Sequence, residues 1–142
     1  MTASTASVQR SFRLSRATSE LLDTAAESSG ESRNGLVDRL LGEAVRTERH
    51  PLIRFRAGAA GRREPQLVGT RLLVRQVVAT VRGHGSDLEA SATYLDVPAR
   101  VVHAAVSYYA EFTDEVDADA ERAARIEAGE RARWEREQAA LA

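Results

Sequence analysis

The chain of 142 residues has no cysteine, which excludes disulfide bonds, thiol chemistry and any zinc site built on cysteine ligands. It also lacks lysine, so arginine supplies all 20 basic side chains, and arginine suits two-pronged contacts with phosphates and base edges. No apolar run approaches the roughly 20 residues that span a bilayer, and residues 1–10 lack the apolar stretch of a secretory signal. We therefore expect a cytoplasmic protein with no membrane partner.

Charge is unevenly distributed, although the formal net charge is only −1. Residues 51–85 contain seven arginines and one acid, whereas residues 113–142 contain five arginines and nine acids. A basic middle and an acidic end are typical of a protein with one surface for a polyanion and another for a cationic partner. Ordinary scatter of surface charge is the plainer interpretation, and composition does not decide between the two.

The first fifty residues predict a strand followed by two helices. Apolar and polar side chains alternate over residues 8–15, which indicates a half-buried strand. Ser15 is the expected N-cap of the first helix, and Gly30 is expected to end it. The second helix is expected to start at its N-cap Ser32 and to end at residues 50–51. The apolar face of the strand would carry Val8, Phe12 and Leu14.

One copy of this segment is too small to be stable. About 45 residues bury too little surface, and a lone strand leaves its backbone groups unpaired. Pairing two copies of the strand gives a two-stranded antiparallel ribbon over four helices. With its alternating strand, its Gly30-x-Ser32-x-Asn34 turn and its two helix lengths, the segment 8–49 resembles the Arc/MetJ-type ribbon–helix–helix family. The resemblance implies a homodimer that binds double-stranded operator DNA.

The same resemblance implies two kinds of DNA contact. A two-stranded ribbon fits the major groove, where Gln pairs with adenine, Arg with guanine and Ser with either. The start of the second helix would receive a phosphate on its free backbone N–H groups. Arg10 departs from the pattern because it interrupts the inward face, and a merely solvated strand face is the alternative. The expected base contacts are Gln9, Ser11 and Arg13, and the expected phosphate contacts are Ser32, Arg33 and Asn34.

The middle of the chain predicts a β-hairpin and three helices, so the fold class is mainly α with short β elements. Residues 52–56 alternate, a glycine-rich turn follows, and residues 66–70 are again extended in character. The helices are one of about ten residues from Leu72 that ends at Gly83-His84-Gly85, one that Ser86 caps, and one from Pro98, at its first helical position, to about Phe112.

The second and third of these helices have helix-turn-helix spacing, with a small Ala92 where they cross and Asp96 where such motifs usually have glycine. Four segments occur in order: His50-Pro51-Leu52-Ile53-Arg54-Phe55, Gly61-Arg62-Arg63, Leu67-Val68-Gly69-Thr70-Arg71 and Tyr108-Tyr109-Ala110-Glu111-Phe112-x-x-Glu115-Val116-Asp117. In these segments the chain is similar to the bacterial helix-turn-helix family of domain of unknown function 433. Some members are VapB-like antitoxins, encoded beside PIN-like proteins, a metal-dependent ribonuclease fold.

Charge indicates which part of this domain would contact a polyanion. Asp87, Glu89 and Asp96 surround the helix-turn-helix and would repel phosphate, which argues against a recognition helix in the major groove. The arginines of the hairpin and the first helix are better phosphate candidates. A solvated basic face, contact with the DNA backbone and docking to an acidic partner all stay open. These arginines are Arg54, Arg56, Arg62, Arg63, Arg71 and Arg75.

Residues 117–142 predict a charged helix of about 24 residues, roughly 36 Å long. Ala, Glu and Arg dominate, and so little apolar surface makes the helix marginal by itself. It is either a frayed surface helix or a segment that orders on a partner, as the C-terminal part of VapB-type antitoxins wraps the toxin. The candidate toxin contacts are Tyr108, Tyr109, Phe112, Ile126 and Trp134.

Nothing in the sequence favours catalysis. His50, His84 and His103 lie far apart, and no pattern pairs them with a nucleophile. The acids of residues 114–119 lack a helical histidine or a calcium-loop glycine, so a helix N-terminal charge cluster explains them better than a metal site. We expect no enzyme, no cofactor and no metal.

The predicted organisation is a disordered N-terminus (1–7), a dimeric DNA-binding domain (8–50), a hairpin and helix-turn-helix domain (51–116) and a helical tail (117–142). The expected function is that of an antitoxin in a type II toxin–antitoxin pair, which binds operator DNA as a dimer, represses its own transcription and neutralises a PIN-like ribonuclease. The alternative is a stand-alone dimeric repressor whose second domain oligomerises or senses a signal. An interaction module without DNA binding is the third interpretation.

Overall fold

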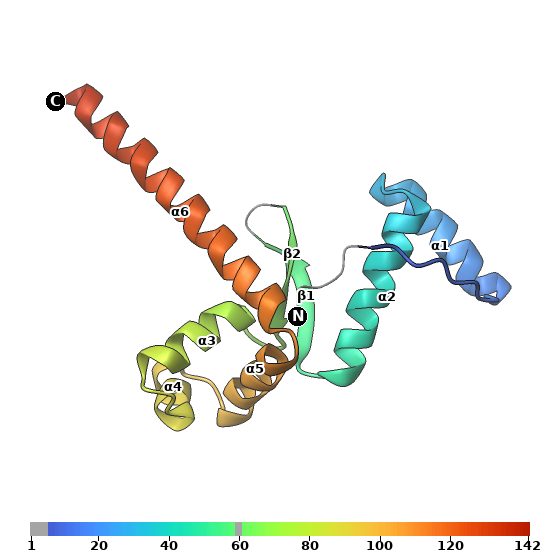
Figure 1. Ribbon diagram of the computed structural model, residues 1–142, viewed down its shortest axis with the longest axis horizontal. Coiled ribbons are helices and arrows are strands. Elements are labelled where there is room, and N and C mark those ends of the chain that lie inside the picture. Colours follow the sequence, from blue (N-terminus) through green and yellow to red (C-terminus); the bar gives the residue numbers. More distant parts are fainter. Residues whose placement is uncertain (1–5, 59–60) are drawn as a thin grey trace. The chain divides into compact units, whose positions relative to one another are not determined.

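The computed structural model describes residues 6–58 and 61–142 and is mainly helical, with one small antiparallel sheet (Figure 1). This confirms the predicted class of a mainly α protein with short β elements. The chain divides into two compact units, Met1–Arg49 and His50–Ala142, here called the N-terminal and C-terminal units. Of the segment predicted to be disordered, residues 1–5 lie outside the described residues.

The N-terminal unit contains two helices, α1 (Arg16–Ser29) and α2 (Arg33–Arg49). Ser15 caps α1, because its side-chain oxygen accepts from the Thr18 backbone N–H at 3.2 Å. Gly30 ends α1 in the left-handed conformation, at a φ of 68°, which glycine adopts without steric cost. The Ser32 Oγ accepts from the Gly35 N–H at 3.1 Å and so caps α2. The predicted caps of both helices are confirmed.

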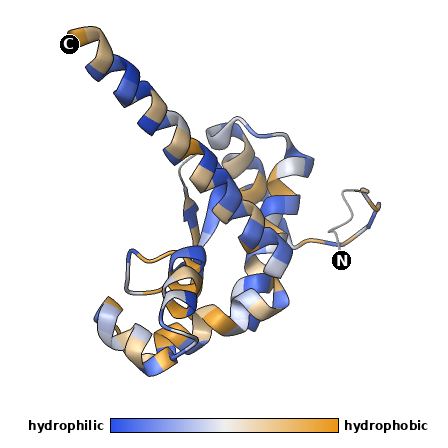
Figure 2. Cartoon of the chain, turned by 60° about the vertical axis from the view of Figure 1, so that its left-hand side comes forward, coloured by the Kyte–Doolittle hydropathy of each residue, from blue (hydrophilic) through white to orange (hydrophobic). Residues whose placement is uncertain are grey.

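The strand predicted over residues 8–15 is not formed in the single chain. Residues 6–15 lie in neither helix nor strand, and both strands of the described sheet belong to the C-terminal unit, where they pair with each other. A strand needs a neighbour for its backbone groups, and the described part of the N-terminal unit offers none. Figure 2 shows hydrophobic and hydrophilic residues along this N-terminal segment.

The C-terminal unit begins with a hairpin of β1 (Ile53–Ala57) and β2 (Arg63–Leu67), in which Phe55 lies opposite Pro65. The hairpin is as predicted, but its second strand starts three residues earlier than expected. Of the extended structure predicted over residues 66–70, residues 66–67 are confirmed as part of β2 and residues 68–70 are wrong, because the chain turns directly after the strand. There the Thr70 N–H donates to the Leu67 carbonyl at 3.1 Å, and Gly69 has a φ of 79°.

Four helices follow the hairpin and enclose one hydrophobic core with it (Figure 1). The helices are α3 (Val74–Gly83), α4 (Leu88–Leu95), α5 (Ala99–Glu111) and α6 (Thr113–Leu141). The fully buried side chains at the centre of this core are Ile53, Leu67, Val74, Val77, Val102, Tyr108 and Val116.

Three predicted helix boundaries are corrected. The carboxylate of Asp87, not Ser86, caps α4 by accepting from the Ala90 N–H at 2.9 Å. Pro98 is the N-cap of α5 and has an extended backbone, so it does not occupy the first helical position. The tail helix begins at Thr113, four residues before the predicted 117, because Val116 packs in the core.

Only the first half of α6 packs against the C-terminal unit. Up to Ile126 the helix has buried or half-buried side chains at helical spacing, whereas residues 127–141 are exposed apart from the half-buried Ala132. Two large apolar side chains lie in the exposed half, Trp134 and Leu141. Along most of this half the helix is hydrophilic (Figure 2).

Candidate nucleic-acid interface

The described part of the N-terminal unit exposes most of its large apolar side chains. Among its described residues only Leu36 is fully buried. Seven others are between 41% and 74% exposed, and they come from the N-terminal segment and from both helices. Scattered exposed apolar residues are ordinary, but a cluster in one small unit marks an interaction surface. We call this set the apolar face: Val8, Phe12, Leu14, Leu21, Leu40, Leu41 and Val45.

The residues predicted to contact bases are exposed on the segment that carries part of this face. Gln9, Ser11 and Arg13 alternate with Val8, Phe12 and Leu14, and Arg10 is exposed as well. In an extended chain successive side chains point to opposite faces. If the segment becomes a strand, the three polar residues therefore share the face opposite Phe12 and Leu14.

The predicted phosphate contacts lie together at the start of α2. Ser32, Arg33 and Asn34 are all exposed. Ser32 uses its side chain on the Gly35 N–H, while the first N–H groups of any helix have no acceptor within it. Arg33 forms a surface ion pair with Asp23 at 2.8 Å, a partner that the sequence analysis missed. An anion at this position would compete with that carboxylate.

A second ion pair holds the connector between α1 and α2. The Arg39 guanidinium donates from Nε and Nη2 to the two carboxylate oxygens of Glu31, at 3.0 and 2.7 Å. The hydrogen bonding of Arg39 to the Glu31 carboxylate raises the pKa of Arg39. This two-pronged contact fixes the turn directly before the α2 N-terminus, so the N-terminal end of α2 is held in place by its own unit.

The prediction that Arg75 of the C-terminal unit contacts phosphate is corrected. Its Nε donates to the Glu64 carboxylate at 2.7 Å, and Glu64 is only 6% exposed. A buried carboxylate needs its cation, so Arg75 serves Glu64. The sequence held a hint of this, because Glu64 is the one acid among the seven arginines of residues 51–85. Arg62, Arg63 and Arg71 are exposed, as are Arg54 and Arg56.

A half-buried carboxylate of α6 lies close to this pair. Asp119 accepts from Arg122 Nη2 at 2.6 Å. Burial, and next the negative charge of Glu64, raise the pKa of Asp119, although Arg122 and Arg62 act against both. The first turns of α6 are thereby coupled electrostatically to β2 of the hairpin.

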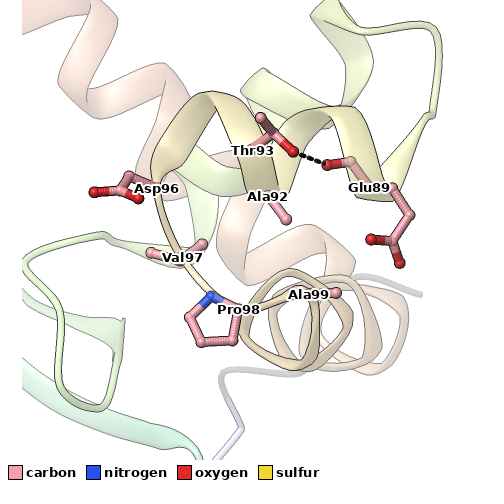
Figure 3. A pocket seen from close by; sticks show the side chains of 7 residues that line it. All are labelled: Glu89, Ala92, Thr93, Asp96, Val97, Pro98 and Ala99. Atoms are coloured by element: carbon pink, nitrogen blue, oxygen red, sulfur yellow. Dashed lines mark hydrogen bonds between the residues drawn. The ribbon is translucent and has the colours of Figure 1, made fainter.

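The turn between α4 and α5 borders a pocket that has two acidic residues among those that line it. Its lining includes Glu89, Asp96 and Pro98 (Figure 3). Asp96 adopts the left-handed conformation, with a φ of 54°, that such turns usually give to glycine. The aspartate therefore preserves the turn geometry but adds a carboxylate at the start of α5. Both carboxylates disfavour phosphate here.

The predicted toxin contacts divide between core and surface. Tyr108 is only 1% exposed, so it is withdrawn as a partner contact. It packs edge-on against His50, whose Nε2 lies 2.8 Å from Glu111 Oε2. Periodicity gave no sign of this pairing of His50. Tyr109 is half-buried, and its hydroxyl accepts from Arg82 and donates to Asp117. Phe112 and Ile126 are half-buried, and Trp134 is 59% exposed.

Residues 6–58 and 61–142 contain neither a metal-ligand cluster nor a membrane-spanning helix. No cluster of three or more metal-ligating side chains occurs among them. None of the helices described has both the length and the apolar character needed to cross a membrane. Comparisons with protein-family models, with curated proteins and with solved structures found no match to this chain. The two family resemblances therefore rest on the residues and motifs that carry them.

Proposed function

We propose that this protein is the DNA-binding antitoxin of a type II toxin–antitoxin pair. In this proposal the N-terminal unit pairs with a second copy and binds operator DNA, which represses transcription. The C-terminal unit neutralises a PIN-like ribonuclease, with the exposed half of α6 as the main contact. The single observation that carries the proposal is the apolar face of the N-terminal unit.

A second copy of the chain is the partner that best suits the apolar face. The face includes an unpaired segment whose polar and apolar residues alternate, and an antiparallel ribbon formed with its own copy would satisfy that backbone. Burying one Val, Leu or Phe side chain stabilises by roughly 1.5–3 kcal/mol. In a symmetric dimer both copies of each of these seven residues would be buried. Because these side chains are 41–74% exposed in the single chain, each gains a fraction of this range, and the sum over both copies opposes the cost of association.

Dimerisation also supports the DNA-binding half of the proposal. A ribbon formed by residues 8–14 would turn Gln9, Ser11 and Arg13 outward, and all three side chains have hydrogen-bonding groups for base edges in the major groove. The exposed start of α2 supplies backbone N–H groups that suit a phosphate. Base contacts and backbone contacts would then come from one unit.

The antitoxin half of the proposal depends on α6. A helix whose last fifteen residues have few packing partners is free to lay one face into a groove of another protein. Trp134 is the expected anchor, since aromatic residues dominate the energetics of such contacts. A stand-alone repressor is the second candidate function, and the small number of apolar side chains beyond Ile126 favours it.

The DNA-binding half is tested by selecting the preferred duplex from a random pool and measuring affinities for the preferred and an unrelated sequence. Arg13→Ala should lose roughly 1–3 kcal/mol of discrimination at one base pair. Arg100→Ala, an exposed arginine on α5, is the matched control and should keep the preference. An equal loss by Arg13→Ala on every sequence would rule out base contact.

The antitoxin half is tested by co-expression with the product of the adjacent reading frame, followed by affinity purification and sizing. We expect a stable complex, a neighbour that is toxic when expressed alone, and weaker binding by Trp134→Ala. Tyr94→Ala is the control, because Tyr94 is an aromatic residue on α4 that is more exposed than Trp134, at 71% against 59%. A lone dimer with no co-purifying neighbour would favour the stand-alone repressor.

A further inference from the structure

Five exposed arginines lie on the hairpin of the C-terminal unit or directly beside its second strand and the turn after it, with Arg54 and Arg56 on one face of the hairpin and Arg63 on the other. Arg54 and Arg56 lie two residues apart on β1, opposite Gln66 and Glu64. The other three lie where β2 begins and in the turn after it. We call this set the hairpin arginine surface: Arg54, Arg56, Arg62, Arg63 and Arg71.

The carboxylate that lies opposite Arg56 in the hairpin is buried and is paired with Arg75 instead. Glu64 is the one acid of residues 51–85, and it is buried against Arg75. A Cβ at Gly58 would collide with the Glu64 carboxylate, so the glycine makes room for this arrangement. Arg54, Arg56 and Arg71 form no ion pair with any residue in the described ranges 6–58 and 61–142. Uncompensated positive charge therefore stays on the outside of the hairpin.

Three of the arginines are positioned by the fold. The Arg63 Nη2 donates to the Phe55 carbonyl at 3.1 Å, which ties its side chain across the hairpin. Arg54 and Arg56 share one face of β1, about 6.6 Å apart along the strand. A short paired hairpin holds such side chains with less conformational freedom than a loop does.

We propose that the hairpin arginine surface binds the phosphate backbone of the DNA that the N-terminal unit binds. The inference rests on the proposed function for the identity of the DNA, and it adds a second contact site in the other unit. Guanidinium groups form two-pronged hydrogen bonds with phosphate oxygens. These contacts would strengthen binding on all sequences alike and would leave base preference to residues 9–13.

DNA suits this surface better than an acidic protein does for two reasons. Only residues 50–52 separate α2 from β1, so a hairpin tethered this closely would meet the bound duplex at a high effective concentration. The start of α5, where a helix-turn-helix would approach DNA, is bordered by Glu89 and Asp96. Their charge excludes phosphate there and leaves the hairpin as the DNA-facing part of this unit.

The test compares two double variants of the full chain on a duplex that extends beyond the preferred site at both ends. Arg54→Gln/Arg56→Gln removes two hairpin charges, and Arg100→Gln/Arg125→Gln removes two exposed charges from α5 and α6 as a matched control. Affinity is measured over a range of salt concentrations. Each lost phosphate contact reduces the slope of log K against log salt by about 0.9. We expect the hairpin variant to lose about 1.8 per copy of the chain, with unchanged sequence preference, and the control to keep the original slope.

The remaining outcomes distinguish failure of the hairpin proposal from failure of the proposed base contacts. An unchanged slope in the hairpin variant, or an equal loss in the control, would overturn the hairpin proposal. The same variants are also titrated with polyglutamate, and a hairpin variant that loses polyglutamate binding but keeps its DNA slope would overturn the proposal in favour of an acidic protein. If Arg13→Ala keeps its sequence preference while the hairpin variant loses slope, the base-contact proposal fails and the hairpin proposal stands. If the original chain binds no duplex at any salt concentration, both fail.

Discussion

The two units treat their apolar residues in opposite ways. In the C-terminal unit the hairpin and α3 to α6 enclose a core of fully buried side chains, whereas the described part of the N-terminal unit encloses Leu36 alone. Both units have well-formed, capped helices, so local sequence preferences are satisfied in each. The difference shows that caps and periodicity specify helices, while a core needs enough elements to surround it. In our proposal the N-terminal unit reaches that number by pairing with a second copy.

The largest effect is expected from a charge placed on the apolar face. Phe12 and Tyr94 are almost equally exposed, at 72% and 71%, but they lie in different units. Phe12→Asp should raise the dissociation constant of the dimer by at least about 100-fold, because each of the two copies loses roughly 1.5–3 kcal/mol of burial. Tyr94→Asp should leave the constant unchanged. Sedimentation equilibrium measures both, and equal effects would remove the contrast between the units.

The buried ion pair of the C-terminal unit should give the next largest effect. Arg75→Ala leaves the Glu64 carboxylate buried without its cation, at a cost of about 3 kcal/mol in the free energy of unfolding. Adding Glu64→Gln should restore much of this loss, because a neutral amide is cheaper to bury. Urea denaturation of the single and double variants checks this. A double variant as unstable as Arg75→Ala alone would show that packing of the arginine, and not charge, matters.

Substitutions at the left-handed residues that end α1 and α4 should change the stability of the two units in opposite directions. Gly30→Ala forces a side chain into the left-handed conformation and should cost about 1 kcal/mol in the N-terminal unit. Asp96→Gly relieves that same strain in the C-terminal unit and should stabilise it by up to about 1 kcal/mol. Thermal denaturation monitored by circular dichroism compares them. Destabilisation by Asp96→Gly would mean that the aspartate side chain contributes more than its backbone conformation costs.

The smallest effect concerns the pH dependence of the C-terminal unit. Burial and the charge of Glu64 raise the pKa of Asp119 above its ordinary 3.8 in the folded state. The stabilising contribution of this group is therefore complete below pH 3.8 and is lost as the pH rises through the raised pKa. The free energy of unfolding of the original chain, relative to that of Asp119→Asn, should therefore decline as the pH rises from 3.8 through the raised pKa of Asp119. A difference that stays constant or grows with pH would contradict this assignment.

Most of the helices could be predicted because their determinants are local. Ser15, Gly30 and Ser32 act within a few residues of their own positions, and the structure places each as predicted. The errors arose where a distant residue decides. Val116 extends α6 toward the core by packing with other elements, and Glu64 joins a strand because Arg75, eleven residues away, neutralises it.

The residues of the candidate site were likewise predictable where local pattern decides and not where packing between elements decides. Alternation identified the residues that a ribbon would expose, but a strand between two chains cannot form in one chain, so the expected base contacts stay a prediction. In the C-terminal unit, amphipathic spacing could not separate Tyr108, which is buried, from Tyr109, which reaches Arg82 and Asp117. Adjacent residues on a helix differ by 100° in direction, and only the packed structure shows which one the core takes.

Hydrogen exchange of the amides of residues 8–14 tests the central claim most directly, because that claim is an inter-chain strand. It should be measured at protein concentrations above and below the dimer dissociation constant. The account predicts protection at the higher concentration that disappears on dilution, while the core amides of α3 and α5 stay protected at both. Residues 8–14 that exchange freely at every concentration would contradict the claim and leave the apolar face to a different partner.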